Sequence, residues 1–145
     1  MAMAEVGTWI IDTGLEAVGP VAGAVRALAL PVLGEEGAGD LELALTEAVT
    51  NVIRHGYGPE GGPVRVEAEV QGRQMRICIF DWGRQVPGEA LAGAGLHRFD
   101  FDPEDIEGLP AGGMGLSLIT VLMDEVSYRT DLGQNRLTLL RGPRD

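Results

Sequence analysis

The chain has 145 residues, of which 45% are hydrophobic and 23% charged. This balance predicts one globular domain and excludes both a disordered chain and two full domains. The net charge of −11, from 22 acidic and 11 basic residues, argues against nucleic acid as the main partner, because phosphate backbones attract a basic surface. The sequence shows no signal peptide, and no stretch approaches the roughly 20 apolar residues of a membrane span. We therefore expect a cytoplasmic protein that does not contact a membrane.

The N-terminal part of the chain predicts one strand and two helices. Residues 8–12 are rich in β-forming types. Residues 15–33 have helical apolar spacing, and Gly19 with Pro20 marks either a late start or a kink. The segment "EEGAGD" then predicts a turn, with Asp40 as the N-cap of a second helix. The breaker run "HGYGPEGGP" should end that helix.

The C-terminal part predicts two hairpins separated by a helix. The alternating runs "VRVEAEVQ" and "QMRICIF" flank the turn "GR", and "EVSYRT" and "NRLTLLR" flank "DLGQ". Between the hairpins, residues 83–113 hold three prolines and seven glycines and predict a functional lid, followed by the helix "MGLSLITVLMD". The order β-α-α-β-β-lid-α-β-β predicts an α+β fold, a two-layer sandwich with helices on one face of the sheet.

The second helix, "ELALTEAVTNVIRHGYG", carries a line of polar residues beside its apolar stripe. Glu47, Asn51 and His55 stand at i, i+4 and i+8, so their side chains share one side of the helix. Glu47 is a possible general base, and Asn51 a possible oxygen ligand for a hard ion such as magnesium. The alternative is a solvated polar face, with His55 capping the last carbonyl groups.

Two further segments could bind a ligand. In "FDWG", Asp81 ends an apolar strand and, as an acceptor, would select a ligand edge that offers an amino group, while Gly83 would let a flat ligand approach the backbone. In "GGMGLSLI", glycines precede a helix, and backbone N–H groups there form an anion site. The alternatives are an ordinary strand-end turn and a hinge without a ligand.

In order and spacing, "ELALTEAVTNVIRHGYG", "IFDWGRQVP", "GGMGLSLITVLMDEVSYR" and "GQNRLTLL" resemble the GHKL (Bergerat-fold) ATP-binding domains. Within these domains, they are most similar to the anti-sigma-factor serine kinases of bacterial partner-switching systems. The resemblance covers the chain from about residue 40 to its end. It implies a single domain over residues 1–145 with a histidine-kinase-like ATPase fold. The sheet would be mixed and mostly antiparallel, with an ATP lid at about residues 84–113.

The resemblance also implies roles for individual residues. Glu47 would be catalytic and activate the attacking hydroxyl, and Asn51 would bind the nucleotide and hold Mg²⁺ against its phosphates. Asp81 would read the adenine amino group, with Gly83 beneath the ring. The other positions implied to bind ATP are Gly113, Met114, Gly115, Leu116 and Thr138. His55 is expected to be structural.

The implied activity is that of a Mg-ATP-dependent protein serine/threonine kinase and anti-sigma factor. It would phosphorylate a STAS-type anti-sigma-factor antagonist and sequester a sigma factor or a PPM-type phosphatase, and it is expected to form a homodimer. Arg84 and Arg98 are the only lysine or arginine residues of the expected lid that could contact the γ-phosphate. The alternative is a non-catalytic ATP-binding switch that regulates such a partner. An ATPase or a fragment of a histidine kinase fits less well.

Overall fold

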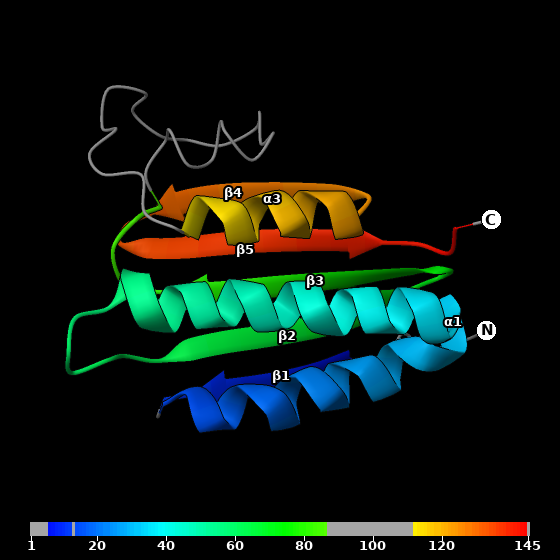
Figure 1. Ribbon diagram of the computed structural model, residues 1–145, viewed down its shortest axis with the longest axis horizontal. Helices are drawn as coiled ribbons and strands as arrows, with labels where there is room; N and C mark the ends of the chain where they lie inside the picture. The colour runs from blue at the N-terminus through cyan, green and yellow to red at the C-terminus, as the bar shows by residue number, and fades with distance from the viewer. Residues whose placement is uncertain (1–5, 13, 87–111, 145) are drawn as a thin grey trace.

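The computed structural model describes residues 6–12, 14–86 and 112–144. Five strands form one open sheet in the order β1-β2-β3-β5-β4, and the helices α1 and α3 cover one face of it (Figure 1). All four ladders among the described strands are antiparallel, so the predicted two-layer α+β sandwich is confirmed. Residues 87–111, most of the expected lid, lie outside the described part. The strands are β1 (Val6–Ile11), β2 (Val64–Gln71), β3 (Gln74–Asp81), β4 (Glu125–Asp131) and β5 (Gln134–Arg141).

Helix α1 (Val18–Asn51) is a hairpin of two helices, with a 3₁₀ turn (Leu15–Ala17) before it and a π turn (Val52–Gly56) after it. Its first half runs beside β1, and its second half returns over β2 and β3 (Figure 1). Of the two alternatives at Gly19 and Pro20, the late start is confirmed, because both residues lie in the first turn of α1.

The predicted turn "EEGAGD" and the N-cap role of Asp40 are wrong. Residues 35–40 are helical, and the chain turns back earlier, at Gly34, whose φ of 78° and ψ of 178° interrupt the helix. This backbone region is open essentially to glycine alone. Pro31 contributes to the break, because proline has no N–H for the helical ladder. Across the hairpin, Arg26 NH1 lies 3.3 Å from Glu42 Oε1.

Strand parity decides which residues face the helices. On β3, Ile77, Ile79 and Asp81 are buried on the face of the sheet that the helices cover. Residues directly opposite each other in a ladder point to the same face, so the partners of these residues on β5 also face the helices. Asp81 is thereby opposed to Asn135, and Cys78, on the other face, is opposed to Thr138. The core between sheet and helices includes Val25, Ala29, Leu41, Leu45, Val49, Val64, Val66, Ile77, Ile79, Ile119 and Leu139.

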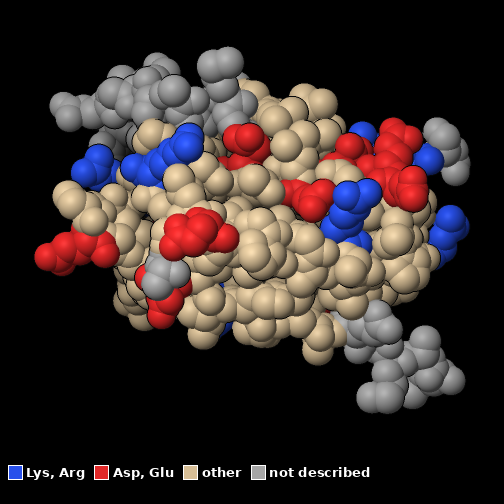
Figure 2. Space-filling view, turned by 60° about the horizontal axis from the view of Figure 1, so that its bottom comes forward, with Lys and Arg blue, Asp and Glu red and all other residues tan. Residues whose placement is uncertain are grey.

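The stretch 15–56 contains an 18-residue window with a mean hydropathy of 1.6, which is apolar enough for a membrane span by length and composition. Only 28% of that window is buried, and Leu15 and Leu30 are about two-fifths exposed, at 41% and 42%. Figure 2 shows a broad uncharged area on this side of the molecule.

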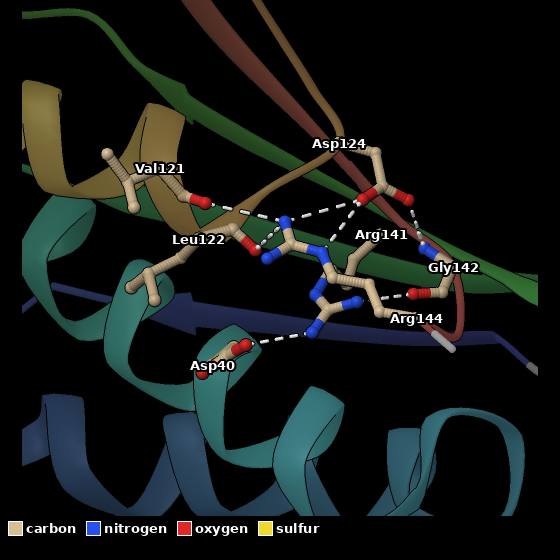
Figure 3. A network of polar contacts seen from close by, with 7 residues as sticks. All are labelled: Asp40, Val121, Leu122, Asp124, Arg141, Gly142 and Arg144. Atoms are coloured by element: carbon tan, nitrogen blue, oxygen red, sulfur yellow. Dashed lines mark hydrogen bonds and ion pairs between the residues drawn. The ribbon is translucent and has the colours of Figure 1, made fainter.

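Ion pairs and hydrogen bonds join the end of β5 and the residues after it to α1 and to the C-terminal end of α3 (Gly112–Leu122) (Figure 3). Arg141 is 1% exposed, and its NH2 donates to Asp40 Oδ2 over 2.8 Å. Arg144 donates to the carbonyl of Leu122 over 3.0 Å, which satisfies one of the free acceptors at the end of α3. Asp124 accepts from the N–H of Gly142 over 2.7 Å. This end of α3 is therefore fixed, while its glycine-rich beginning lies at the other end of the helix.

Candidate nucleotide-binding site

Glu47 and Asn51 occupy the last two turns of α1, on partly buried positions beside α3. The Nδ2 atom of Asn51 is buried and has no hydrogen-bond partner among the described residues. A buried amide without a partner is costly, so the Asn51 side chain is a candidate for contact with a ligand. The π turn Val52–Gly56 follows directly, and such turns are frequent at functional sites.

Asp81 ends β3 next to the end of α1 and is only 6% exposed. Its Oδ1 accepts two hydrogen bonds, from the N–H of Gly83 over 2.9 Å and from Asn135 Nδ2 over 2.8 Å. Its Oδ2 accepts no hydrogen bond from the described residues. Burial raises the pKa of Asp81 above its ordinary value, and the bonds from Asn135 and Gly83 oppose that rise. The carboxylate is therefore oriented, with one oxygen left to accept from a ligand.

Asn135 is a component of the site that the sequence analysis missed. It is 1% exposed, and besides Asp81 it donates to the carbonyl of Gly83 over 3.0 Å. Its Oδ1 accepts from Thr130 Oγ1 over 2.9 Å. The segment "GQNRLTLL" contained it, but only the strand register shows that Asn135, and not Thr138, is opposed to Asp81.

Gly83 packs directly on the end of α1. A Cβ atom built on Gly83 would collide with the carbonyl oxygen of Gly56, and the N–H of Arg84 donates to that same oxygen over 2.5 Å. The close approach of two backbones explains the glycine without a ligand. That Gly83 also lies beneath a bound ring stays a prediction.

Two tyrosines fasten the turn that follows Asp81. The Tyr57 hydroxyl accepts from the N–H of Trp82 over 2.8 Å and donates to the carbonyl of Pro63 over 2.6 Å. The Tyr128 hydroxyl accepts from the N–H of Val86 over 3.0 Å. Burial raises the pKa of Tyr57, and it raises the pKa of Tyr128 to about 12, so both remain protonated at neutral pH. Neither tyrosine was among the predicted site residues.

Besides the end of α1 and the end of β3, the third segment of the candidate site is the beginning of α3. Helix α3 lies beside the second half of α1 (Figure 1). Gly113, Met114 and Gly115 lie in its first turn, whereas the sequence analysis expected the glycines to precede the helix. The first N–H groups of a helix have no partner within it, and they carry the positive end of the helix dipole. This turn can therefore hold an anion.

A family model of the histidine kinase-like ATPase domain matches residues 12–141. The chain belongs to this family. A solved structure of the RsbU and RsbW domains of a Mycobacterium tuberculosis protein is similar to this chain, with a TM-score of 0.62 and 20% sequence identity. The match covers 94% of this chain and 32% of that chain. The predicted histidine-kinase-like ATPase fold is therefore confirmed.

Among curated proteins, the ATPase domain is similar to serine-protein kinases and to an anti-sigma factor. The serine-protein kinase RsbW of Halalkalibacterium halodurans is 35% identical over 98 residues, which are 65% of this chain and 56% of that protein. RsbW of Staphylococcus epidermidis is 36% identical over 96 residues, 65% of this chain and 59% of that protein. The anti-sigma F factor of Clostridium acetobutylicum is 28% identical over 102 residues, 70% of this chain and 67% of that protein. The chain spans somewhat more than half the length of the two RsbW relatives.

One predicted ligand contact needs correction. Thr138 is opposed to Cys78 on the open face of the sheet, 3.8 Å from its sulfur, so it cannot share a pocket with Asp81. The side chain of Leu116 is 6% exposed and belongs to the hydrophobic core, so a contact of Leu116 with the nucleotide would be made by its backbone and stays a prediction. His55 and the side chain of Arg84 are exposed. Arg98 lies outside the described residues.

A separate cleft of about 580 Å³ opens on the β1 side of the end of α1. It lies between the end of β1, at Ile11 and Asp12, and the loop from Tyr57 to Gly62. Arg54 also lines it, whereas Asn51 and Asp81 do not. The cleft is therefore not the site formed by Asp81, Asn51 and the beginning of α3.

Proposed function

We propose that this ATPase domain is a Mg-ATP-dependent protein serine/threonine kinase and anti-sigma factor. Its substrate would be a serine of a STAS-type anti-sigma-factor antagonist, and it would sequester a sigma factor or a PPM-type phosphatase as a cytoplasmic homodimer. The names of the relatives, serine-protein kinase and anti-sigma F factor, support this function. The arrangement of Glu47 and Asn51 on α1 supports the chemistry.

The observation that carries the proposal is the unpartnered amide of Asn51, one helical turn after Glu47. Amide oxygen and nitrogen are assigned from the hydrogen-bond network, so an amide without partners can present its oxygen to a cation. Among the described residues, no cluster of three or more His, Cys, Asp or Glu could hold a metal ion. This agrees with magnesium, which proteins commonly bind through one or two side chains and the phosphates of the substrate. Bound in this way, the ion would offset negative charge on the phosphates.

The residues of the site would then have separate roles in nucleotide binding and in phosphoryl transfer. Asp81 Oδ2 would accept from the adenine amino group, and the first N–H groups of α3 would hold the phosphates. Glu47 would take the proton of the serine hydroxyl as its oxygen bonds to the γ-phosphorus, while the bond to the β–γ bridging oxygen breaks and ADP leaves. No second acid or base is needed for this step.

The test uses two substitutions on the same helix. With γ-labelled ATP and a STAS-domain protein, Glu47→Gln should keep ATP affinity within a few-fold, but transfer should fall by roughly 10²–10⁴-fold, the usual contribution of a positioned base. Asn51→Ala should weaken ATP binding itself, and the remaining binding should lose most of its magnesium dependence. Equal and small effects of both substitutions would show that Glu47 and Asn51 do not belong to the nucleotide site.

The same experiment examines the alternative, a non-catalytic switch. If Glu47→Gln leaves the regulation of the sigma factor or phosphatase fully intact, the protein acts by ATP-gated binding, and the kinase proposal fails. Sedimentation or light scattering of the pure protein measures the expected homodimer, and a monomer with full kinase activity would contradict it.

A further inference from the structure

The nucleotide site contains a buried amide whose hydrogen-bonding atoms are all engaged by the protein. Asn135 donates from Nδ2 to Asp81 Oδ1 and to the carbonyl of Gly83, over 2.8 and 3.0 Å. Its Oδ1 accepts from the Thr130 hydroxyl. Because Asp81 Oδ1 and the carbonyl of Gly83 can only accept, the amide cannot turn over without losing both bonds from Nδ2.

These contacts determine how the Asp81 carboxylate is presented. Oδ1 receives both donors, from Asn135 and from the N–H of Gly83, so it cannot itself carry a proton. The carboxylate can rotate little without losing a bond, which leaves Oδ2 as the oxygen available to a ligand. The bond from Asn135 to Gly83 also fixes the turn against which that ligand would lie.

We propose that Asn135 is a positioning residue that makes the site selective for a purine with a 6-amino group, by holding Asp81 with Oδ2 toward the base. The inference rests on the proposed ATP-binding role of Asp81. A 6-amino group donates to Oδ2, whereas a 6-oxo group sets two acceptors against each other, so the orientation of the carboxylate determines the selectivity.

The charge state of Asp81 supports the same role. Burial raises its pKa, and the hydrogen bond from Asn135 is the largest influence that opposes the rise. Tyr57 and Tyr128 are the titratable neighbours that interact with its charge, and both stay neutral at ordinary pH. Asn135 therefore also helps to keep Asp81 ionised, the state that accepts a hydrogen bond through either oxygen.

The test compares ATP with inosine triphosphate, which has a 6-oxo group and the same ribose and phosphates. Asn135→Leu should lower the ratio of ATP affinity to inosine triphosphate affinity by about tenfold, because the charge-assisted hydrogen bond from the 6-amino group to Asp81 would lose its favourable geometry. Thr130→Val removes the hydroxyl that donates to Asn135 Oδ1 and also bonds Tyr128, and it should lower this ratio by roughly two- to tenfold. Thr138→Val makes the same change on the other face of the sheet and should leave the ratio unchanged.

The outcomes separate this inference from the proposed function. If Asn135→Leu and Thr130→Val weaken both nucleotides equally, the residues are merely structural and the inference is overturned. It is also overturned if the unmodified protein binds ATP without preferring it to inosine triphosphate. If the unmodified protein binds neither nucleotide, the proposed function itself fails. Should Asn135→Leu not fold, as judged by circular dichroism, the ratio for Thr130→Val decides.

Discussion

The carboxylate of Asp40 lies 2.8 Å from NH2 of Arg141, a side chain that is 1% exposed and stands 101 positions later in the chain. This pair links the second half of α1 to the end of β5 (Figure 3). Asp40 is the only carboxylate partner of Arg141 among the described residues, and a buried guanidinium that loses such a partner keeps its charge without compensation, which is strongly destabilising. Asp40 therefore supports the fold through a contact between distant segments.

We expect Asp40→Ala to lower the free energy of unfolding by about 3 kcal/mol, the lower end of the range for breaking a buried pair, since Asp40 itself is partly exposed. Glu42→Ala is the matched control on the same helix. It breaks the pair with Arg26, in which both side chains are over a third exposed, and should cost roughly 0–1 kcal/mol. Urea unfolding of both variants measures the difference. Equal losses would show that Arg141 does not need Asp40.

The hairpin in α1 should depend on Gly34. Its φ of 78° with ψ of 178° is strained for any residue with a Cβ, so Gly34→Ala should lose about 1–3 kcal/mol of stability. Gly39→Ala changes a helical glycine in the second half of α1, where an added Cβ meets no atom within 4 Å, and it should stabilise by roughly 0.4–1 kcal/mol. Thermal unfolding of the two variants should therefore shift in opposite directions. A shared direction would argue against the hairpin.

Gly83 should tolerate no side chain, because a Cβ would meet the carbonyl of Gly56. Gly83→Ala should separate the turn after β3 from the end of α1, at a cost of about 1–3 kcal/mol for overpacking, and ATP affinity should fall with it. Gly58→Ala is the nearby control, since nothing lies within 4 Å of its added Cβ. Calorimetric titration with ATP, together with unfolding curves, measures both effects. Unchanged ATP affinity in a folded Gly83→Ala protein would place the nucleotide elsewhere.

Asp81 should be required for binding but unfavourable for stability. Its pKa in the folded protein lies above the ordinary value of 3.8, so the fold binds a proton more tightly than the unfolded chain does. The stability contributed by Asp81 is thus fully present below pH 3.8 and is lost as the pH rises through the folded pKa. At neutral pH, the ionised carboxylate weakens the ligand-free fold.

Asp81→Asn keeps an acceptor for Gly83 and Asn135 and removes the charge. We expect its ligand-free Tm at pH 7 to equal or exceed that of the parent, and this advantage should shrink as the pH is lowered. ATP affinity should nevertheless fall about ten- to a hundredfold, because a charge-assisted bond is worth roughly 1.5–3 kcal/mol. Unchanged affinity, or equal binding of GTP by the parent, would show that Asp81 does not read the base.

The local patterns of the sequence predicted most of the fold. Both hairpins, the buried stripe of Leu41 and Leu45, and the last helix, predicted at 114–124 and observed at Gly112–Leu122, follow from periodicity and turn residues, which are local properties. The turn of α1 was misplaced because "EEGAGD" is rich in glycine, whereas one backbone conformation at Gly34 makes the actual break. Nothing local indicates that Asp40 pairs with Arg141.

The sequence predicted those parts of the site whose residues lie close together in the chain. Glu47, Asn51 and Asp81 belong to motifs whose residues are close in sequence. The position of Asn135 opposite Asp81 depends on the register of two strands that are more than fifty residues apart. The resemblance implied Thr138 because it matches a strand hydroxyl of the family, but Thr138 stands three residues after Asn135, and a displacement of three residues moves a side chain to the other face of a sheet.

The backbone contact between Gly83 and Gly56 fixes the turn after Asp81 to the end of α1. Because backbone rests on backbone there, with the N–H of Arg84 bonded to Gly56, Asp81 and the end of α1 form one rigid part. On the proposed assignment, we expect the spacing between the group that reads the base and the amide that holds the metal to be the same with ATP and with ADP. We then expect the number of phosphates to be sensed at the beginning of α3, so that the identity of the base and the length of the phosphate chain are read by separate segments.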